Sequence, residues 1–349
     1  MVTIKDVARK SGFAVTTVSF VLNNAPLSKY IADETKARIR RVAKELCYRP
    51  NPLARALRSK RSCTVGVVVF DMSDPYCAQI VRGVENGFYQ SGSYLPILID
   101  VQNDRARFVR FVGMLRDRQV EGLITLGNSI YPEGDLLETL QQCQIPVVII
   151  GRELEANTVS SVTGDNEAAA TTVMEYLYTL GHRRIAFIRG PRVFIDSSQR
   201  WKAIKSFARK VNLQLSEGLI TELNLRNVGY EGGYEMTQRL VGRGEKFTAI
   251  VAHDDLTAIG AMRALFEAGR QIPNDCSVTG FDNVPPSAYS IPPLTTVHQD
   301  MEQQGSIGVE ILLEALRLSA THDRIVPVHR RVTPHLMIRR STAPPRDPA

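Results

Sequence analysis

The chain has 349 residues, of which 44% are hydrophobic and 23% charged, and this composition is typical of a globular protein long enough for two or three domains. Its five cysteines form no CxxC pair, which argues against a disulfide framework or a zinc site and fits a reducing cytoplasm. We find no signal-peptide pattern and no apolar run of transmembrane length. We therefore expect a cytoplasmic protein without a membrane, metal or cofactor partner.

The net charge of +7 is unevenly distributed along the chain. Residues 1–62 contain 14 Lys and Arg against four Asp and Glu, whereas the remainder contains 29 against 32. A basic head on a mildly acidic body is typical of a nucleic-acid-binding module joined to a second function. A merely solvated basic surface explains the charge equally well, so the interpretation depends on motifs.

Residues 1–49 have the periodicity of three short helices. Thr3 and Asp6 form a capping box at the start of the first helix, and Ser11-Gly12-Phe13 ends it. Apolar residues recur at helical spacing from Val15 to Leu22, and a third helix is predicted over Asp33–Glu45. Two helices joined by a tight turn that contains Gly have the geometry of a helix-turn-helix.

The second of these helices is expected to enter the major groove of DNA. We expect its exposed side chains to be Val15, Thr16, Thr17, Ser19 and Phe20. Hydroxyl groups can bond base edges or phosphates, and apolar groups can contact thymine methyls. For Thr16 and Thr17, a purely local role in the first helical turn is an equally good explanation.

Residues 50–62 interrupt this pattern. Pro50-Asn51-Pro52 stops the preceding helix and can begin a new one over residues 53–58, which is too short to be stable alone. We therefore expect a linker helix that forms only against a partner.

From Val65 onward, apolar strand-like segments alternate with amphipathic helices such as Pro75–Tyr89 and Glu167–Thr179. The predicted strands are Val65–Phe70, Leu95–Ile99, Gly122–Leu126, Val147–Ile150, Ile185–Ile188, Ala249–Ala252 and Ser277–Phe281. This alternation predicts an α/β fold with parallel, doubly wound sheets in two lobes. The pattern lapses near Gly151–Thr163, where the lobes should meet.

Several motifs in the same order resemble the LacI/GalR family of bacterial transcription regulators. They are Thr3-Ile4-Lys5-Asp6-Val7-Ala8-Arg9, Thr17-Val18-Ser19, Val21-Leu22-Asn23, Tyr48-Arg49-Pro50-Asn51, Ala54-Arg55 with Leu57, Gly181-His182-Arg183-Arg184-Ile185, Asp254-Asp255-Leu256-Thr257-Ala258-Ile259-Gly260, Gly280-Phe281-Asp282 and Pro292-Pro293-Leu294-Thr295-Thr296-Val297. The resemblance covers nearly the whole chain. It implies a helix-turn-helix domain and a hinge helix, followed by a two-lobed body similar to periplasmic sugar-binding proteins.

The resemblance also implies a domain arrangement. The helix-turn-helix domain would span residues 1–49 and the hinge helix and linker residues 50–62. The N-terminal lobe would combine residues 63–162 and 293–322, and the C-terminal lobe residues 163–292 and 323–341. We expect residues 342–349 to be a disordered tail.

For DNA contacts, the resemblance implies that Thr17, Ser19 and Asn23 contact phosphates or orient on them. It also implies that Leu57 of a hinge helix over residues 50–58 inserts as a wedge in the minor groove, which is compatible with burial against its symmetry mate. Lys5, Arg49, Arg55 and Arg58 are candidate phosphate partners. The complete set of expected DNA-binding residues is Thr3, Lys5, Val15, Thr16, Thr17, Ser19, Phe20, Asn23, Arg49, Asn51, Ala54, Arg55, Leu57 and Arg58.

Two positions depart from the family pattern. Ala14 stands where the family usually has a capping Ser, so the recognition helix is capped more weakly. Phe20 stands where many members carry Arg or another polar residue, which leaves the base preference at that position open.

Carboxylates stand at the ends of several predicted strands, where doubly wound folds bind ligands. Asp71, Asp100, Asp254 and Asp282 occupy such positions, although Asp71 and Asp254 could equally be helix N-caps. The resemblance implies an effector held between the lobes by Asp165, Arg200, Asp254 and Asp282, with Tyr76 in the first lobe, and we add Asp71. Converging carboxylates suit a ligand rich in hydroxyl donors, most simply a sugar or sugar derivative. Trp201 could stack on a sugar, but core packing is the commoner role of a lone Trp.

These patterns predict a regulator, and we expect a repressor, whose operator affinity is controlled by a small effector. A nucleoside or purine effector and a protein co-regulator remain alternatives. An enzyme is disfavoured because no P-loop, HExxH, GxSxG or GxGxxG motif occurs. A solute-binding protein without a regulatory role would account for the two-lobed body but not for the basic head. An operator-free nucleoid protein would account for the basic head but not for the body. Because one recognition helix reads too few base pairs, we expect a homodimer on a pseudo-palindromic operator in double-stranded DNA.

Overall fold

The computed structural model describes residues 2–23, 25–48, 61–127, 133–154 and 159–346. It divides into an N-terminal unit, residues 1–63, and a larger unit, residues 64–349, which we call the body. Over the described ranges, no helix is both long and apolar enough to span a lipid bilayer.

The N-terminal unit is a small helical domain. Its elements are α1 (Ile4–Ser11), α2 (Val15–Leu22), the 3-10 helix η1 (Pro26–Tyr30) and α3 (Asp33–Glu45). Thr3 and Asp6 form the predicted capping box, in which the Thr3 N–H donates to Asp6 Oδ2 at 2.9 Å. Gly12 ends α1 at φ +79°, a conformation that glycine adopts without strain. The three predicted helices are confirmed, and they enclose the buried side chains Val7, Ala8, Val18, Val21, Ile39, Val42 and Ala43.

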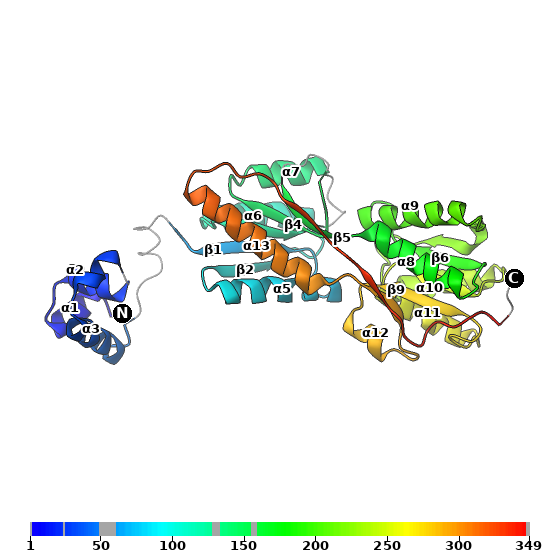
Figure 1. Ribbon diagram of the computed structural model, residues 1–349, viewed down its shortest axis with the longest axis horizontal. Coiled ribbons are helices and arrows are strands. Elements are labelled where there is room, and N and C mark those ends of the chain that lie inside the picture. The colour runs from blue at the N-terminus through cyan, green and yellow to red at the C-terminus, as the bar shows by residue number, and fades with distance from the viewer. Residues whose placement is uncertain (1, 24, 49–60, 128–132, 155–158, 347–349) are drawn as a thin grey trace. The chain divides into compact units, whose positions relative to one another are not determined.

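Two six-stranded sheets form the body, one in each lobe (Figure 1). The N-terminal lobe has the order β11-β5-β4-β3-β1-β2, and the C-terminal lobe β12-β10-β9-β8-β6-β7. The N-terminal strands are β1 (Thr64–Val69), β2 (Leu95–Asp100), β3 (Gly122–Leu126), β4 (Val147–Ile150), β5 (Ser160–Gly164) and β11 (His329–Val332). The C-terminal strands are β6 (Ile185–Arg189), β7 (Ile220–Glu222), β8 (Ala249–Ala252), β9 (Ser277–Phe281), β10 (Thr295–His298) and β12 (His335–Met337). All pairings are parallel except that of β12 with β10.

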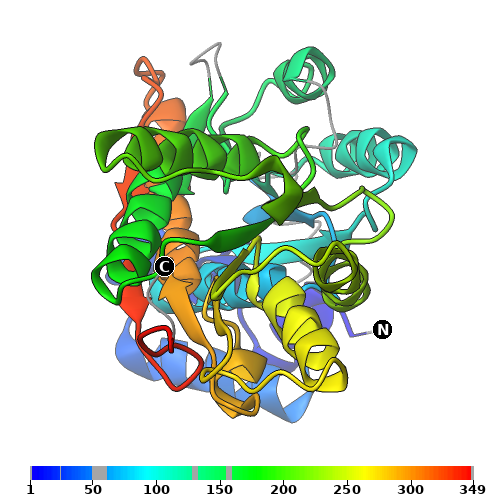
Figure 2. The same cartoon turned by 90° about the vertical axis from the view of Figure 1, so that its right-hand side faces the viewer.

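Helices cover both faces of each sheet, as doubly wound sheets require. Those of the N-terminal lobe are α5 (Pro75–Ser91), α6 (Arg105–Asp117), α7 (Glu133–Gln141) and α13 (Met301–Ala320). Those of the C-terminal lobe are α8 (Asn166–Thr179), α9 (Ile195–Lys210), the 3-10 helix η2 (Glu217–Leu219), α10 (Tyr230–Gly242), α11 (Asp255–Glu267) and α12 (Pro285–Tyr289). Figure 2 shows α8 and α9 on one face of the C-terminal sheet and α10 and α11 on the other. Every strand that the sequence predicted is present.

The predicted lobe boundaries are wrong at two places. Strand β10 (295–298), which we assigned to the N-terminal lobe with residues 293–322, pairs with β9 in the C-terminal lobe. Strand β11 (329–332), which we assigned to the C-terminal lobe with residues 323–341, pairs with β5 in the N-terminal lobe. The chain crosses between the lobes after β5, after β10 and after β11. Such crossings carry no signal in hydrophobic periodicity, because a strand has the same pattern in either sheet.

The described part of the expected tail is ordered rather than disordered. The Ala343 carbonyl lies 3.0 Å from His182 Nε2, and the Ala343 N–H donates to Ser277 Oγ at 3.0 Å. Arg346 forms an ion pair with Asp275 at 2.8 Å. These bonds attach residues 342–346 to the C-terminal lobe, and residues 347–349 lie outside the described range.

Candidate functional site

The first half of α2 presents the predicted reading surface. Val15 is 40% exposed and Thr16 is exposed, whereas Thr17 and Phe20 are half-buried. Thr3 and Lys5 are exposed on and beside α1. These side chains give the N-terminal unit a mixed polar and apolar surface of the kind that contacts base edges.

The expectation that Ser19 is exposed is wrong, because only 6% of it is accessible. Helix α2 packs against α1, α3 and η1, so its buried stripe is wider than the apolar periodicity indicates. The side-chain amide of Asn23 donates to the Ser19 carbonyl at 2.9 Å and to Ser19 Oγ at 3.2 Å, and thereby caps the end of α2.

The start of α2 lacks a side-chain cap, as the presence of Ala14 predicts. Ala14 occupies the N-cap position with extended backbone angles, φ −61° and ψ 146°, and its methyl group cannot accept a hydrogen bond. The other expected DNA-binding residues lie outside the described residues, and they are Arg49, Asn51, Ala54, Arg55, Leu57 and Arg58.

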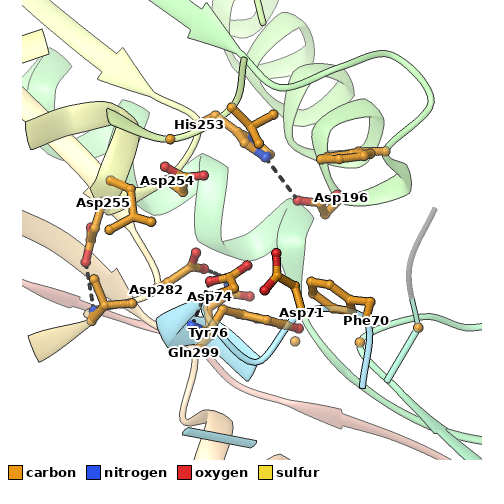
Figure 3. Close-up of a pocket in the computed structure, with 18 of the residues that line it drawn as sticks. Phe70, Asp71, Asp74, Tyr76, Asp196, His253, Asp254, Asp255, Asp282 and Gln299 are labelled. Carbon is orange, nitrogen blue, oxygen red and sulfur yellow. Dashed lines mark hydrogen bonds and ion pairs between the residues drawn. The ribbon is translucent and has the colours of Figure 1, made fainter. Parts of the chain in front are cut away.

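The body contains a cavity of about 350 Å³ that is lined by both lobes (Figure 3). Its polar and aromatic lining residues are Phe70, Asp71, Ser73, Asp74, Tyr76, Asn103, Asn166, Phe194, Asp196, Arg200, His253, Asp254, Asp255, Asp282 and Gln299. Many of them follow the carboxyl ends of parallel strands, where open α/β sheets bind their ligands. The cavity is therefore the candidate ligand site of the body.

Arg200 of α9 is the central cation of this cavity and is only 6% exposed. Its Nη1 donates to the His253 carbonyl at 2.6 Å, and its Nε donates to Asn166 Oδ1 at 3.0 Å. Its Nη2 lies 3.6 Å from Asp196 Oδ2 and 3.8 Å from Asp282 Oδ1. These contacts hold the guanidinium group in place through all three of its nitrogen atoms.

Asp282 follows β9 at φ +97°, a backbone conformation that costs energy for a residue with a side chain. Its N–H donates to the Val297 carbonyl at 2.8 Å, and Gln299 Nε2 donates to its Oδ1 at 2.7 Å. Burial raises the pKa of Asp282 to about 7, and the nearby charges of Asp254 and Asp74 add to the shift while Arg200 opposes it. The strained backbone directs this carboxyl group into the cavity.

Asp74 and Asp254 begin helices and also line the cavity. Asp74 Oδ1 accepts the Tyr76 N–H at 2.9 Å, and Asp254 Oδ1 accepts the Thr257 N–H at 2.6 Å. Burial raises the pKa of Asp74 to about 6 although the hydrogen bond from Tyr76 opposes the shift, and the charges of Asp254 and Asp71 raise it further. For Asp254, the two roles that the sequence left open, helix cap and pocket residue, are compatible.

Aromatic rings border the carboxylates. Phe70 and Tyr76 stack with their centroids 6.4 Å apart, and Phe194 lies 6.1 Å from the His253 ring. Burial also raises the pKa of the Tyr76 hydroxyl, with the charge of Asp282 as the next cause. Rings beside carboxylates can hold the apolar face of a sugar, a heterocycle or a cation.

Five of the six predicted effector residues line the cavity, namely Asp71, Tyr76, Arg200, Asp254 and Asp282. Asp165 does not, because its Oδ1 accepts the Ala168 N–H at 2.9 Å and caps α8, and its neighbour Asn166 lines the cavity instead. Trp201 packs edge-on against Phe187 in the core of the C-terminal lobe.

Sequence reasoning missed the other polar and aromatic residues of the lining, which are Phe70, Ser73, Asp74, Asn103, Asn166, Phe194, Asp196, His253, Asp255 and Gln299. Asp74 stands directly before Pro75, a recognisable helix start at the end of a strand, and so could have been found. The described residues contain no cluster of three or more His, Cys, Asp or Glu side chains able to hold a metal ion.

Family models match both parts of the chain. Residues 3–51 match the bacterial regulatory proteins of the lacI family, and residues 174–342 match a periplasmic binding protein-like domain. The chain is 32% identical over 345 residues to the HTH-type transcriptional repressor PurR of Edwardsiella ictaluri (strain 93-146), covering 98% of this chain and 97% of that protein. It is also 32% identical over 347 residues to PurR of Haemophilus influenzae (strain PittEE), covering 98% of both chains.

Solved structures agree with these matches. The lac repressor dimer bound to operator and the anti-inducer ONPF has a TM-score of 0.86 and 26% identity, covering 98% of this chain and 99% of that one. A complex of the transcriptional regulator CelR with cellobiose has a TM-score of 0.72 and 27% identity, covering 98% of this chain and 100% of that one. The chain belongs to the LacI family of bacterial regulatory proteins, and it is a DNA-binding transcriptional regulator controlled by a small-molecule effector rather than an enzyme.

Proposed function

We propose that the effector binds in the cavity between the lobes and is a hydroxyl-rich small molecule of the sugar class. The observation that carries this proposal is the set of carboxylates at strand ends, Asp71, Asp74, Asp254 and Asp282, beside the aromatic rings of Phe70 and Phe194. Carboxylate oxygens accept hydrogen bonds from hydroxyl groups, and the rings cover the apolar face of a sugar. The cellobiose complex of CelR supports the same class.

A purine or nucleoside is the second candidate. The PurR relatives favour it, and the stacked rings of Phe70 and Tyr76 offer a surface for a planar heterocycle. A nucleoside combines a heterocycle with ribose hydroxyl groups, so the same carboxylates would serve it.

We further propose a homodimer that binds a pseudo-palindromic operator. The similar lac repressor is a dimer on its operator. Strand β2 is the edge of its sheet and exposes Leu95 (64%) and Leu98 (39%), and Tyr289 and Ile291 are 85% and 93% exposed on the C-terminal lobe. Exposed large apolar side chains, such as those of Leu95 and Leu98 at an open sheet edge, are suited to burial against a second copy of the chain.

In this proposal the exposed first turn of α2 reads bases. Lys5 and the basic residues Arg49, Arg55 and Arg58 contact phosphates, and Leu57 wedges into the minor groove. Effector binding changes the closure of the lobes and therefore the geometry of the two hinge segments, which couples the two sites.

A thermal-shift screen of the full-length protein tests the effector site. The screen compares sugars, sugar phosphates, nucleosides and amino acids, because a ligand that binds the native state raises its stability by mass action. A hit in one class should be lost in Asp282→Asn and retained in Asp165→Asn, whose side chain lies outside the cavity. A hit that Asp282→Asn leaves unchanged would place the ligand elsewhere and refute the proposed site.

A further inference from the structure

The cavity carries more carboxylates than its cations can neutralise. Six line it, which are Asp71, Asp74, Asp196, Asp254, Asp255 and Asp282, and Arg200 is the one guanidinium group in its lining as described. Asp255 is fully buried, and it accepts hydrogen bonds from the Val284 N–H and the Thr296 hydroxyl. Burial raises the pKa of Asp255 well above its ordinary value, and both of its oxygens are already engaged by hydrogen bonds within the protein.

Arg200 does not form ion pairs with all of the remaining carboxylates. Its Nη2 lies between Asp196 and Asp282, and its other donors go to Asn166 and to the His253 carbonyl. Over the described ranges, Asp74 and Asp254 have no ion pair, and each accepts one backbone N–H. Asp282 is 8% exposed, and its Oδ2 accepts no hydrogen bond from the residues that the structure describes.

These three carboxylates lie close enough to repel one another. Figure 3 shows Asp74 beside Asp282, and Asp254 lines the same cavity. The charges of Asp254 and Asp74 both raise the pKa of Asp282, and Asp254 raises that of Asp74. The cavity therefore contains a region of negative potential next to the rings of Phe70 and Tyr76, whose faces also attract cations.

This step rests on the proposed effector site. We propose that the effector carries a protonated amine seated among Asp74, Asp254 and Asp282, so that the ligand is an amino sugar or another amino polyol. The amine supplies the missing positive charge, while the hydroxyl groups of the same ligand bond the remaining carboxylate oxygens. A neutral sugar satisfies the hydrogen bonds but brings no positive charge to Asp74 and Asp254, and an anionic ligand adds to the repulsion.

Matched pairs of probes test this inference by calorimetry and thermal shift on the full-length protein. The amines are glucosamine, galactosamine and mannosamine, the neutral partners are glucose, galactose, mannose and N-acetylglucosamine, and adenosine represents nucleosides. We expect an amine to bind at least about 10-fold more tightly than its neutral partner, since the two differ by an ion pair in a shielded site. At pH 6, binding of the amine should also release protons to the solution. The positive charge of the ligand favours the ionised forms of Asp74 and Asp282, whose raised pKa values keep them partly protonated in the free protein.

Three variants make the test specific. Asp74→Asn and Asp254→Asn should each remove most of the preference for the amine, because Asn keeps the helix cap but loses the charge. Asp104→Asn is the matched control, since Asp104 caps α6 through the Arg107 N–H and does not line the cavity. It should bind every probe as the unaltered protein does.

Each outcome separates this inference from the proposed function. Three results would refute the amine and leave the proposed effector site unaffected. They are a neutral partner that binds as tightly as its amine, a preference for the amine that persists in both Asn variants, and adenosine as the probe that binds most tightly. Binding of no probe at all, by protein that still binds operator DNA, would overturn the amine and the sugar class together.

Discussion

Replacement of Asp282 by Asn should stabilise the body at high pH. Asn resembles the protonated carboxyl group in size and can still accept the hydrogen bond from Gln299. The pKa of Asp282 rises from 3.8 to about 7 on folding, so the ionised group costs the native state about 4 kcal/mol, at about 1.4 kcal/mol for each tenfold change. Because the folded pKa is raised, this cost is absent below pH 4, grows as the pH rises and is complete above about pH 7.

The assay is urea unfolding followed by tryptophan fluorescence at one protein concentration. Trp201 is the only tryptophan and packs in the C-terminal lobe that contains Asp282, so its signal reports the relevant unfolding. Asp282→Asn should unfold with a free energy about 4 kcal/mol higher at pH 8 and within about 1 kcal/mol of the unaltered protein at pH 4.5. The exposed Asp117→Asn should show no such gain. A variant less stable at pH 8, or a gain equal at both pH values, would refute the reasoning.

Three further changes have definite expected outcomes. Ala14→Ser should stabilise the N-terminal unit by about 1 kcal/mol in heat unfolding followed by circular dichroism, because it supplies the missing cap of α2, and no change would contradict this. Gly260→Ala should destabilise the body by about 1–3 kcal/mol, since its Cβ would lie 2.0 Å from the Tyr230 carbonyl oxygen, whereas Gly113→Ala, in open space, should not lower the free energy of unfolding. Leu57→Ala should weaken binding to operator far more than binding to random DNA in gel shifts, and equal losses would refute the wedge.

The sequence predicted most elements because their signals are local. The strand Ala249–Ala252 and the helix Asp33–Glu45 coincide with the observed β8 and α3, since an apolar run and a 3.6-residue period each specify one element. The predicted lobe assignment of β10 and β11 is wrong because a short strand has the same hydrophobic pattern whichever sheet it joins. Ser19 is predicted to be exposed because the apolar periodicity of a helix does not show how many other helices pack against it.

The cavity was only partly predictable for a similar reason. Asp254 and Asp282 stand at strand ends and were found by that rule. Gln299 and Asp196 reach the cavity from an interlobe connection and from the first turn of a helix, so only the folded chain brings them to the carboxylates. Burial is the main cause that raises the pKa of Asp282, and the charges of Asp254 and Asp74 add to it. Asp74 precedes Asp282 by more than 200 residues, so the sequence does not show that the two are neighbours.

Operator binding in the presence and absence of effector tests the central claim most directly. Footprinting of the full-length protein on the DNA upstream of its own gene should reveal a discrete, pseudo-palindromic protected site. A ligand found in the thermal-shift screen should change the Kd for that site at least about 10-fold, a coupling within the usual range, and Asp282→Asn should abolish the change while it retains operator binding. Uniform protection without a discrete site, or an effector response preserved in Asp282→Asn, would contradict the account.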